Sequence, residues 1–259
     1  MVRRCGARQY LGGVLGAAVA ALTAPGAAAS SPGAPIWSGV YVGMHAGYGW
    51  GDTSIRDGGT VITSGFPPFG AFSCGAALSG NYCNTPFELQ PKGWLGGVHA
   101  GVNWQKGNLV VGAEGDFGRL AVADAKTLNR PLGDQDFGSV KYGWYGTLTG
   151  RLGYAANDAL VYVKGGLAVA DIKVRAADID FVIYPGSLID DSGVRTGWAL
   201  GGGLEYVLGP NTALKAEYLH MNFGSDTSRS PDGDIYRHTH ALHTVSVGLS
   251  FRVPPVPVQ

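Results

Sequence analysis

The sequence has no net charge, few charged residues and no long hydrophobic run after its N-terminal region. Its 19 Lys and Arg residues equal its 19 Asp and Glu residues in number, so it lacks the positive charge on which nucleic-acid binding depends. Charged residues make up only 15% of the chain and give no sign of a charged disordered tail. Beyond residue 29 no segment approaches the roughly eighteen consecutive apolar residues of a transmembrane helix. A membrane-spanning helix is therefore excluded there.

The N-terminal region has the pattern of an export signal. Three arginines precede the apolar run from Leu11 to Leu22, and small residues follow. This order predicts a secretory signal peptide over residues 1–29, cleaved after Ala29 and carrying Cys5 away with it. Twelve apolar residues are too few to anchor the chain in a bilayer. The mature protein is thus expected to be exported, as a soluble protein or as an inserted barrel.

Glycine is abundant, and it alternates with apolar residues. The stretch 37–51 reads WSGVYVGMHAGYGWG, with glycines on one parity and large apolar residues such as Val42 and Trp50 on the other. A period of two indicates a β-strand. The alternation recurs along the chain and predicts eight strands, over residues 37–51, 93–105, 109–117, 140–154, 159–170, 195–206, 212–220 and 241–253.

The connections between these strands alternate between short and long. Three are turn-like, at 105–108, 155–158 and 208–211, and the four others run for roughly twenty to forty residues. Structureless loops of that length are unusual in a compact soluble domain, whereas a transmembrane barrel has short periplasmic turns and long extracellular loops. The sequence therefore predicts an all-β fold, an eight-stranded antiparallel up-and-down transmembrane β-barrel with four long extracellular loops, in the outer membrane. The expected parts are the signal peptide (1–29), a short lead (30–36), the barrel (37–253) and a Pro-rich tail (254–259).

Aromatic residues on the apolar parity gather at both ends of the strands. A bilayer selects such girdles at its two interfaces, whereas a soluble barrel would have a polar outer face. Beside the short turns the expected girdle contains Trp104, Tyr154, Tyr206 and Phe251. Beside the long connections it contains Tyr48, Trp50, Trp94, Phe117, Tyr142, Trp144 and Trp198.

The other parity should face the lumen. Eight strands enclose an interior just wide enough for side chains to fill, so inward glycines make room for longer neighbours. Charges buried there should pair, because isolated buried charges are costly. The inward charged residues are Glu114, Asp116, Glu205 and Glu217, and Lys141, Arg151, Lys164 and Lys215. We predict that they form a packed ionic plug rather than a water-filled channel, and that His45 and His99 join this network.

The strand sequences resemble those of a known family. The segments WSGVYVGMHAGYGWG, GWLGGVHAGVNWQ, GRLGYA, YVKGGLAVA and VGLSFRV are similar to the strands of small alphaproteobacterial outer-membrane proteins. These are eight-stranded barrels grouped with opacity-type porin-like and haemin-binding surface proteins. The resemblance implies a structural surface protein that supports envelope integrity and contacts or adheres to a host or environmental surface ligand through its loops. A haemin-binding surface receptor and a small-solute porin are the alternatives.

The resemblance also implies partners. The lipid bilayer of the outer membrane would surround the barrel. The barrel-insertion machinery reads an aromatic residue at the end of the last strand in such proteins, where this sequence has Val253 followed by PPVPVQ.

Two cysteines fall in the first long connection. Cys74 and Cys83 remain after removal of the signal peptide, and an exported chain passes through an oxidising compartment. We therefore expect a disulfide between Cys74 and Cys83 rather than two free thiols.

Histidines cluster before the last expected strand. His238 and His240 are two residues apart, a spacing that suits a metal ion or a haem group on one strand face, and His243 is close by. The three form a tentative haem site, but solvated loop histidines are the preferred interpretation. We predict no resident cofactor and no metal site.

No residue pattern indicates catalysis. The outer-membrane deacylases that such a barrel could resemble use a His-x-Ser pair on one strand face, and the sequence contains no such pair. The carboxylates of Glu114 and Asp116 face a filled lumen, where a substrate has no access. The protein is therefore not expected to be an enzyme.

Overall fold

The computed structural model describes residues 36–57, 87–129, 135–179, 188–229 and 235–253. Within these ranges the regular elements are β-strands. No helix in the described part of the chain is long and apolar enough to cross a bilayer. The described residues belong to one compact unit, which spans residues 34–259.

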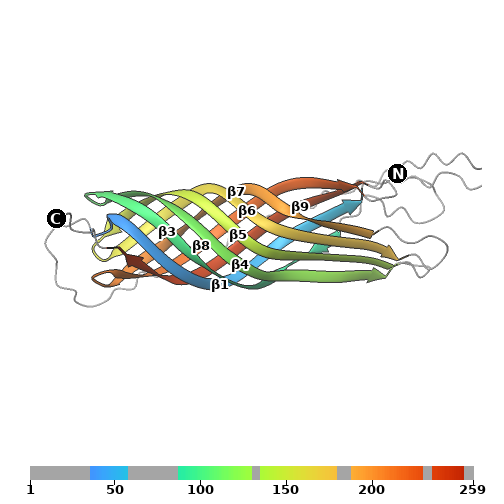
Figure 1. Ribbon diagram of the computed structural model, residues 1–259, viewed down its shortest axis with the longest axis horizontal. Helices are drawn as coiled ribbons and strands as arrows, with labels where there is room; N and C mark the ends of the chain where they lie inside the picture. The colour runs from blue at the N-terminus through green and yellow to red at the C-terminus, as the bar shows by residue number, and fades with distance from the viewer. Residues whose placement is uncertain (1–35, 58–86, 130–134, 180–187, 230–234, 254–259) are drawn as a thin grey trace, which may run out of the picture. The chain divides into compact units, whose positions relative to one another are not determined.

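In the described part of the chain, nine strands form one antiparallel sheet that closes on itself. They are β1 (Gly39–Asp57), β2 (Phe87–Leu89), β3 (Lys92–Lys106), β4 (Leu109–Asn129), β5 (Gln135–Ala156), β6 (Ala159–Ile179), β7 (Leu188–Gly209), β8 (Thr212–Arg229) and β9 (Ile235–Arg252). From β3 to β9 each strand pairs with the next along the chain, and β1 pairs with both β3 and β9. Figure 1 shows these strands wrapping obliquely around a common axis. The predicted antiparallel barrel of eight strands is confirmed.

The short strand β2 adds no ninth member to the ring. It pairs with β1 from Thr53 to Ile55, beyond Trp50, where the pairing of β1 with β3 ends. Residue Pro91 lies in the break between β2 and β3, and proline has no N–H to donate to a ladder. The carbonyl oxygen of Pro91 still accepts a hydrogen bond from the backbone N–H of Gly51 at 2.8 Å. We therefore describe β2 as an interrupted continuation of β3.

Two-residue turns join three pairs of strands at one end of the ring. They lie between β3 and β4, β5 and β6, and β7 and β8, inside the predicted turns 105–108, 155–158 and 208–211. Gly107 and Asn157 have φ angles of 61° and 53° in the first two turns. Glycine and asparagine tolerate this left-handed conformation, which tight hairpins require. The short turns are confirmed.

At the other end the strands run further than the alternation predicts. The sequence places the end of β4 at residue 117, yet the strand continues to Asn129, so only residues 130–134 separate it from β5. Residues 180–187 and 230–234 are the corresponding intervals before β7 and β9. The prediction of long loops is therefore wrong for these three connections, because much of each is strand.

The physical reason is an exchange of faces, which β4 illustrates: along the strand, the apolar residues change from the outer face to the inner face. In the predicted part of β4 the apolar side chains point outward, as Phe117 does. Two residues further on, Arg119 is exposed, whereas Leu120 and Val122 are buried. Beyond the apolar belt the ring thus has a polar outside and an apolar inside, as in a soluble sheet. The outward apolar face of the strand therefore ends at this exchange, although the strand itself continues.

A bulge in β5 changes which residues face outward. The register between β5 and β6 shifts between Tyr142 and Tyr145, and the register between β4 and β5 shifts at the same level, between Arg119 and Val122. An extra residue in one strand moves the residues after it to the opposite face. Tyr142 is accordingly buried rather than part of the outer girdle, and Lys141 is exposed rather than in the lumen. Both predictions are corrected.

The outer surface carries the expected apolar belt between two aromatic girdles. Aliphatic side chains such as Leu148, which is 63% exposed, cover the middle of the strands. The girdle beside the short turns contains Trp104, Tyr154, Tyr206 and Phe251. The opposite girdle contains Tyr48, Trp50, Trp94, Phe117 and Trp198, with Trp144 half-buried beside them. This surface suits lipid on all sides of the ring.

Candidate functional site

The lumen is the candidate functional site, and buried side chains line it in layers. The layer nearest the short turns is apolar, and the backbone N–H of Trp37 donates to Gln105 Oε1 at 2.9 Å just before β1 begins. The Arg252 guanidinium donates to the carbonyl oxygen of Ile36. This apolar layer consists of Trp37, Val110, Ala155, Leu160, Tyr162 and Ala213. The residues just before the first strand therefore help to fill the periplasmic end of the ring.

The next layer is centred on the carboxylate of Glu114 in β4. Its Oε1 atom accepts hydrogen bonds from the Nζ atoms of Lys164 and Lys215, each at 2.8 Å. Its Oε2 atom accepts from the Tyr41 hydroxyl at 2.8 Å and from Arg151 Nη1 at 3.2 Å. Glu114 is only 1% exposed. One carboxylate thus connects β4 with four other strands from the inside.

Two further carboxylates complete this layer. Glu205 lies 2.7 Å from Arg151 Nη1, and Glu217 lies 2.7 Å from Lys164 and 3.0 Å from Lys215. We call Glu114, Arg151, Lys164, Glu205, Lys215 and Glu217 the ionic cluster. It contains three carboxylates and three cations, so its formal charge is zero. Such pairing is what buried charges require to offset their desolvation.

Tyrosine rings pack against the ionic cluster. The Arg151 guanidinium lies 4.9 Å from the centre of the Tyr41 ring and 4.6 Å from that of Tyr162, distances that allow cation–π attraction. The room for these rings comes from glycine. A Cβ atom on Gly101 would lie 2.3 Å from the Tyr41 hydroxyl, and one on Gly203 would lie 2.6 Å from that of Tyr162. The prediction that inward glycines make room for long side chains is confirmed here.

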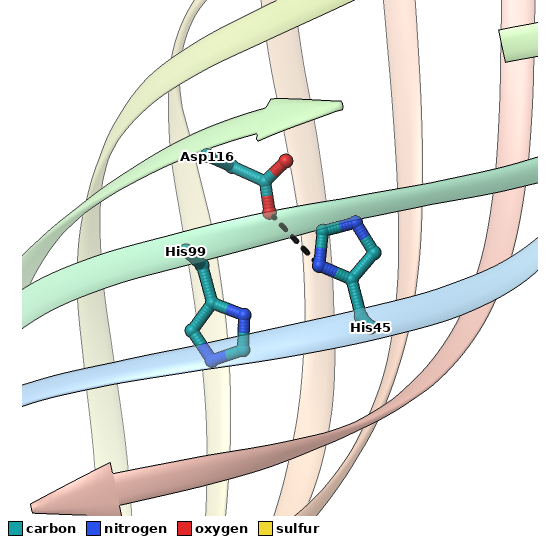
Figure 2. Close-up of side chains that lie close together, drawn as sticks. All are labelled: His45, His99 and Asp116. Carbon is teal, nitrogen blue, oxygen red and sulfur yellow. Dashed lines mark ion pairs between the residues drawn. The ribbon is translucent and has the colours of Figure 1, made fainter. Parts of the chain in front are cut away.

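Above the ionic cluster lie the two histidines that the sequence places on the lumen face. His45 in β1, His99 in β3 and Asp116 in β4 converge, with Nδ1 of His45 3.6 Å from Oδ2 of Asp116 (Figure 2). The ligand atoms that the three side chains offer lie within 4.8 Å of one another. We call them the histidine–aspartate group. Asp116, predicted as part of the ionic network, belongs to this group instead.

A large apolar layer fills the lumen beyond the histidine–aspartate group. One of its members, Tyr142, was predicted in the outer girdle and the others were assigned no role, because the layer follows the exchange of faces described above. The signal was present in RLAVAD (119–124), where the apolar parity changes sides. The layer consists of Leu89, Leu95, Leu120, Val122, Val140, Tyr142, Tyr145, Ala168, Ala170, Ile172, Val174, Ala199, Leu219, Met221, Phe223 and Leu242.

The tentative haem histidines do not form one site. His238 and His240 share a face as predicted, but they lie in β9 and are buried, at 0% and 2% exposure. Their rings are stacked at 6.3 Å, and His240 Nδ1 lies 3.3 Å from Thr53 Oγ1. His243 points to the opposite face, where its ring stacks on Trp50 at 5.8 Å. The interpretation as solvated loop histidines is therefore wrong as well.

Burial keeps the inner histidines uncharged. His238 and His240 lie beyond the outer aromatic girdle, outside the membrane-spanning segments. The pKa of His240 is lowered to about 4, mainly by desolvation and further by His238 and Arg195, against the opposing effect of Asp191. Desolvation also lowers the pKa of His238. Both imidazoles are neutral at pH 7 as a result. The expected disulfide of Cys74 and Cys83 lies outside the described residues.

The fold and its surfaces define a class of protein. A closed ring of antiparallel strands and an apolar belt between aromatic girdles describe an integral outer-membrane β-barrel. Residues 15–252 match the family model described as the outer membrane protein beta-barrel domain, and the chain belongs to this family. The predicted family and the outer-membrane location are confirmed.

The chain is similar to several named proteins. The chain is 32% identical over 256 residues to the 31 kDa outer-membrane immunogenic protein of Brucella melitensis, covering 92% of this chain and 98% of the relative. It is 28% identical over 183 residues to the 22 kDa outer membrane protein of Rhizobium leguminosarum bv. viciae, covering 70% and 76% of the two chains. Among solved structures, OprG from Pseudomonas aeruginosa covers 83% of this chain and 98% of its own, with 9% identity and a TM-score of 0.47.

Proposed function

We propose that the protein is a sealed structural barrel of the outer membrane, which supports the envelope and is neither an enzyme nor an open pore. The observation that carries this proposal is the position of Glu114. Its carboxylate binds groups from β1, β5, β6 and β8 at the axis of the ring. Because this side chain accepts hydrogen bonds from four other strands across the lumen, it also occupies the path that a solute would take.

The layers on either side of the ionic cluster support the same function. A hydrated ion that enters from the periplasmic end first meets an apolar layer that includes Trp37 and Leu160. On the other side it meets the larger apolar layer that includes Tyr142 and Met221. Removing water from an ion in apolar surroundings is costly. Both layers therefore favour closure over transport.

Surface contact is the second part of the proposal. The strands continue past the outer girdle with a polar outer face, on which Arg175 pairs with Asp190. The Brucella relative is named as an immunogenic outer-membrane protein. We infer that this extension is the part of the chain that meets surface ligands. We prefer it to haemin capture, because two of the three candidate histidines are buried.

Solute flux through vesicles tests the sealed state. Refolded protein in liposomes should allow arabinose to enter no faster than in protein-free liposomes, because the layers leave no aqueous path. The measurement is the swelling rate, with liposomes that contain a general porin as the positive control. Swelling that increases with the amount of folded protein would show an open lumen and would overturn the proposal.

A further inference from the structure

The histidine–aspartate group takes one side chain from each of three strands, at the same level of the lumen. His99 in β3 is the direct cross-strand partner of Asp116 in β4. His45 in β1 pairs with Gly97, two residues from His99. Because residues two apart share a face, the three side chains point into the same space. Figure 2 shows both imidazole rings beside the Asp116 carboxylate. The group is buried, with side-chain exposures of 5% for His45 and 6% for Asp116.

Hydroxyl groups orient both imidazole rings from outside the group. Nε2 of His45 lies 2.7 Å from the Tyr145 hydroxyl, and Nε2 of His99 lies 3.0 Å from Ser250 Oγ. When each Nε2 donates its proton to a hydroxyl oxygen, each Nδ1 carries a lone pair. Metal-binding histidines are held in this way, by a hydrogen bond from the ring nitrogen that does not bind the ion.

The inner atoms of the group lack donors. Among the described residues, His99 Nδ1 and Asp116 Oδ1 are buried without a hydrogen-bond partner. The 3.6 Å between His45 Nδ1 and Asp116 Oδ2 is too long for a hydrogen bond. In the tautomer with both protons on Nε2, two imidazole lone pairs and the Asp116 carboxylate face one another with no cation between them. A cation that binds all three groups would offset the cost of burying this arrangement.

The buried charges of the lumen also favour a cation at the histidine–aspartate group. The ionic cluster is neutral by itself, with three carboxylates and three cations. Asp116 is a fourth buried carboxylate in the described lumen, and no fourth buried Lys or Arg accompanies it there. With neutral histidines, the Asp116 carboxylate thus has no buried Lys or Arg of its own at the level of His45 and His99.

We propose that His45, His99 and Asp116 bind a divalent transition-metal ion inside the barrel. Two imidazole nitrogens and one carboxylate oxygen form a ligand set that zinc accepts, with a fourth position left for water. Zinc takes such ligands at about 2.0–2.2 Å, which places them roughly 3.3–3.5 Å from one another. The ligand atoms, at most 4.8 Å apart, reach this spacing by small side-chain rotations. The ion would connect β1, β3 and β4, and it is independent of the sealed state proposed above.

Metal content after refolding tests the proposal. The lumen is filled on both sides of the site, so the ion should enter while the barrel folds. Mature protein refolded with zinc chloride and then freed of unbound metal by gel filtration should retain about one zinc per folded chain, measured by inductively coupled plasma mass spectrometry. Refolding with cobalt should give the visible absorption of a tetrahedral Co²⁺ site with nitrogen ligands.

Matched variants assign the retained ion. His99→Gln and Asp116→Asn, isolated as the folded gel species, should each lose zinc affinity by about tenfold or more. His243→Gln is the control, because His220 and His243 form an outward pair with Nδ1 atoms 3.4 Å apart. It should retain the zinc of the unsubstituted protein. Zinc lost from His243→Gln but kept by His99→Gln would place the ion on the outer surface and overturn the proposal. Unsubstituted protein that folds yet retains no zinc would overturn it equally.

Discussion

Replacing Glu114 by glutamine should lower the free energy of unfolding by about 3–5 kcal/mol, the usual cost of removing one partner from a buried charge pair. The substitution keeps the size of the side chain but leaves three buried cations with two carboxylates. Lys164 and Lys215 both lose the oxygen that they share at 2.8 Å. The measurement is urea unfolding in lipid vesicles followed by tryptophan fluorescence, with gel mobility of unboiled samples as a check on folding.

Two controls make this expectation specific. Glu88 is exposed, so Glu88→Gln should change the unfolding free energy by less than about 0.5 kcal/mol. The double variant Glu114→Gln/Lys215→Met restores a neutral cluster and should recover part of the loss, because an uncompensated buried charge accounts for most of the cost. A Glu114→Gln barrel as stable as the unsubstituted one would contradict the structural role of the cluster.

Leu148→Arg should destabilise the inserted barrel by about 2–4 kcal/mol, the cost of an arginine on the lipid face near the middle of the bilayer. Leu148 is 63% exposed and lies between the two aromatic girdles, opposite Gly115 and Leu167 of the neighbouring strands. The same vesicle unfolding experiment measures the effect.

Thr127→Arg is the matched control for this lipid-face substitution. Thr127 is exposed on β4 beyond the outer girdle, where an arginine meets water rather than lipid tails. We expect a change within about 0.5 kcal/mol for this variant. Equal destabilisation by Leu148→Arg and Thr127→Arg would mean that the apolar belt does not face the bilayer.

Local alternation was sufficient to predict the ring and most of its lumen. The two-residue period put Glu114 and Lys164 on the inner face, and the structure places both there. The short turns gave the order of the strands, because antiparallel neighbours joined by tight turns lie side by side. These features depend on residues close together in the chain, which is why one sequence suffices for them.

The errors arise where the face of a strand changes. Relative to β6, one extra residue in β5 moved Tyr142 inward and Lys141 outward, and Gly143 at this point does not stand out among the many glycines of these strands. The apolar part of the lumen beyond the membrane belt was missed for a related reason. Apolar residues face the lipid inside the belt, whereas beyond it apolar residues such as Leu120 and Val122 face the lumen. The environment of the strand, water or lipid, decides which parity is buried.

Part of the histidine–aspartate group could be predicted from the sequence. A tight turn after Lys106 makes it the partner of Leu109, and this register places His99 opposite Asp116. The position of His45 beside them needs the pairing of β1 with β3, which the intervening residues 58–86 do not reveal. Alternation gave the faces of the three residues, and only the register between strands gave their proximity.

Single-channel recording is the most direct test of a lumen sealed by its own side chains. Refolded protein, verified as folded by its gel mobility, would be inserted into planar bilayers under an applied voltage. The ionic cluster and the two apolar layers predict a baseline current without stable steps, even at high salt. Steady openings on the nanosiemens scale, in proportion to the number of inserted barrels, would show a continuous aqueous path and contradict the account.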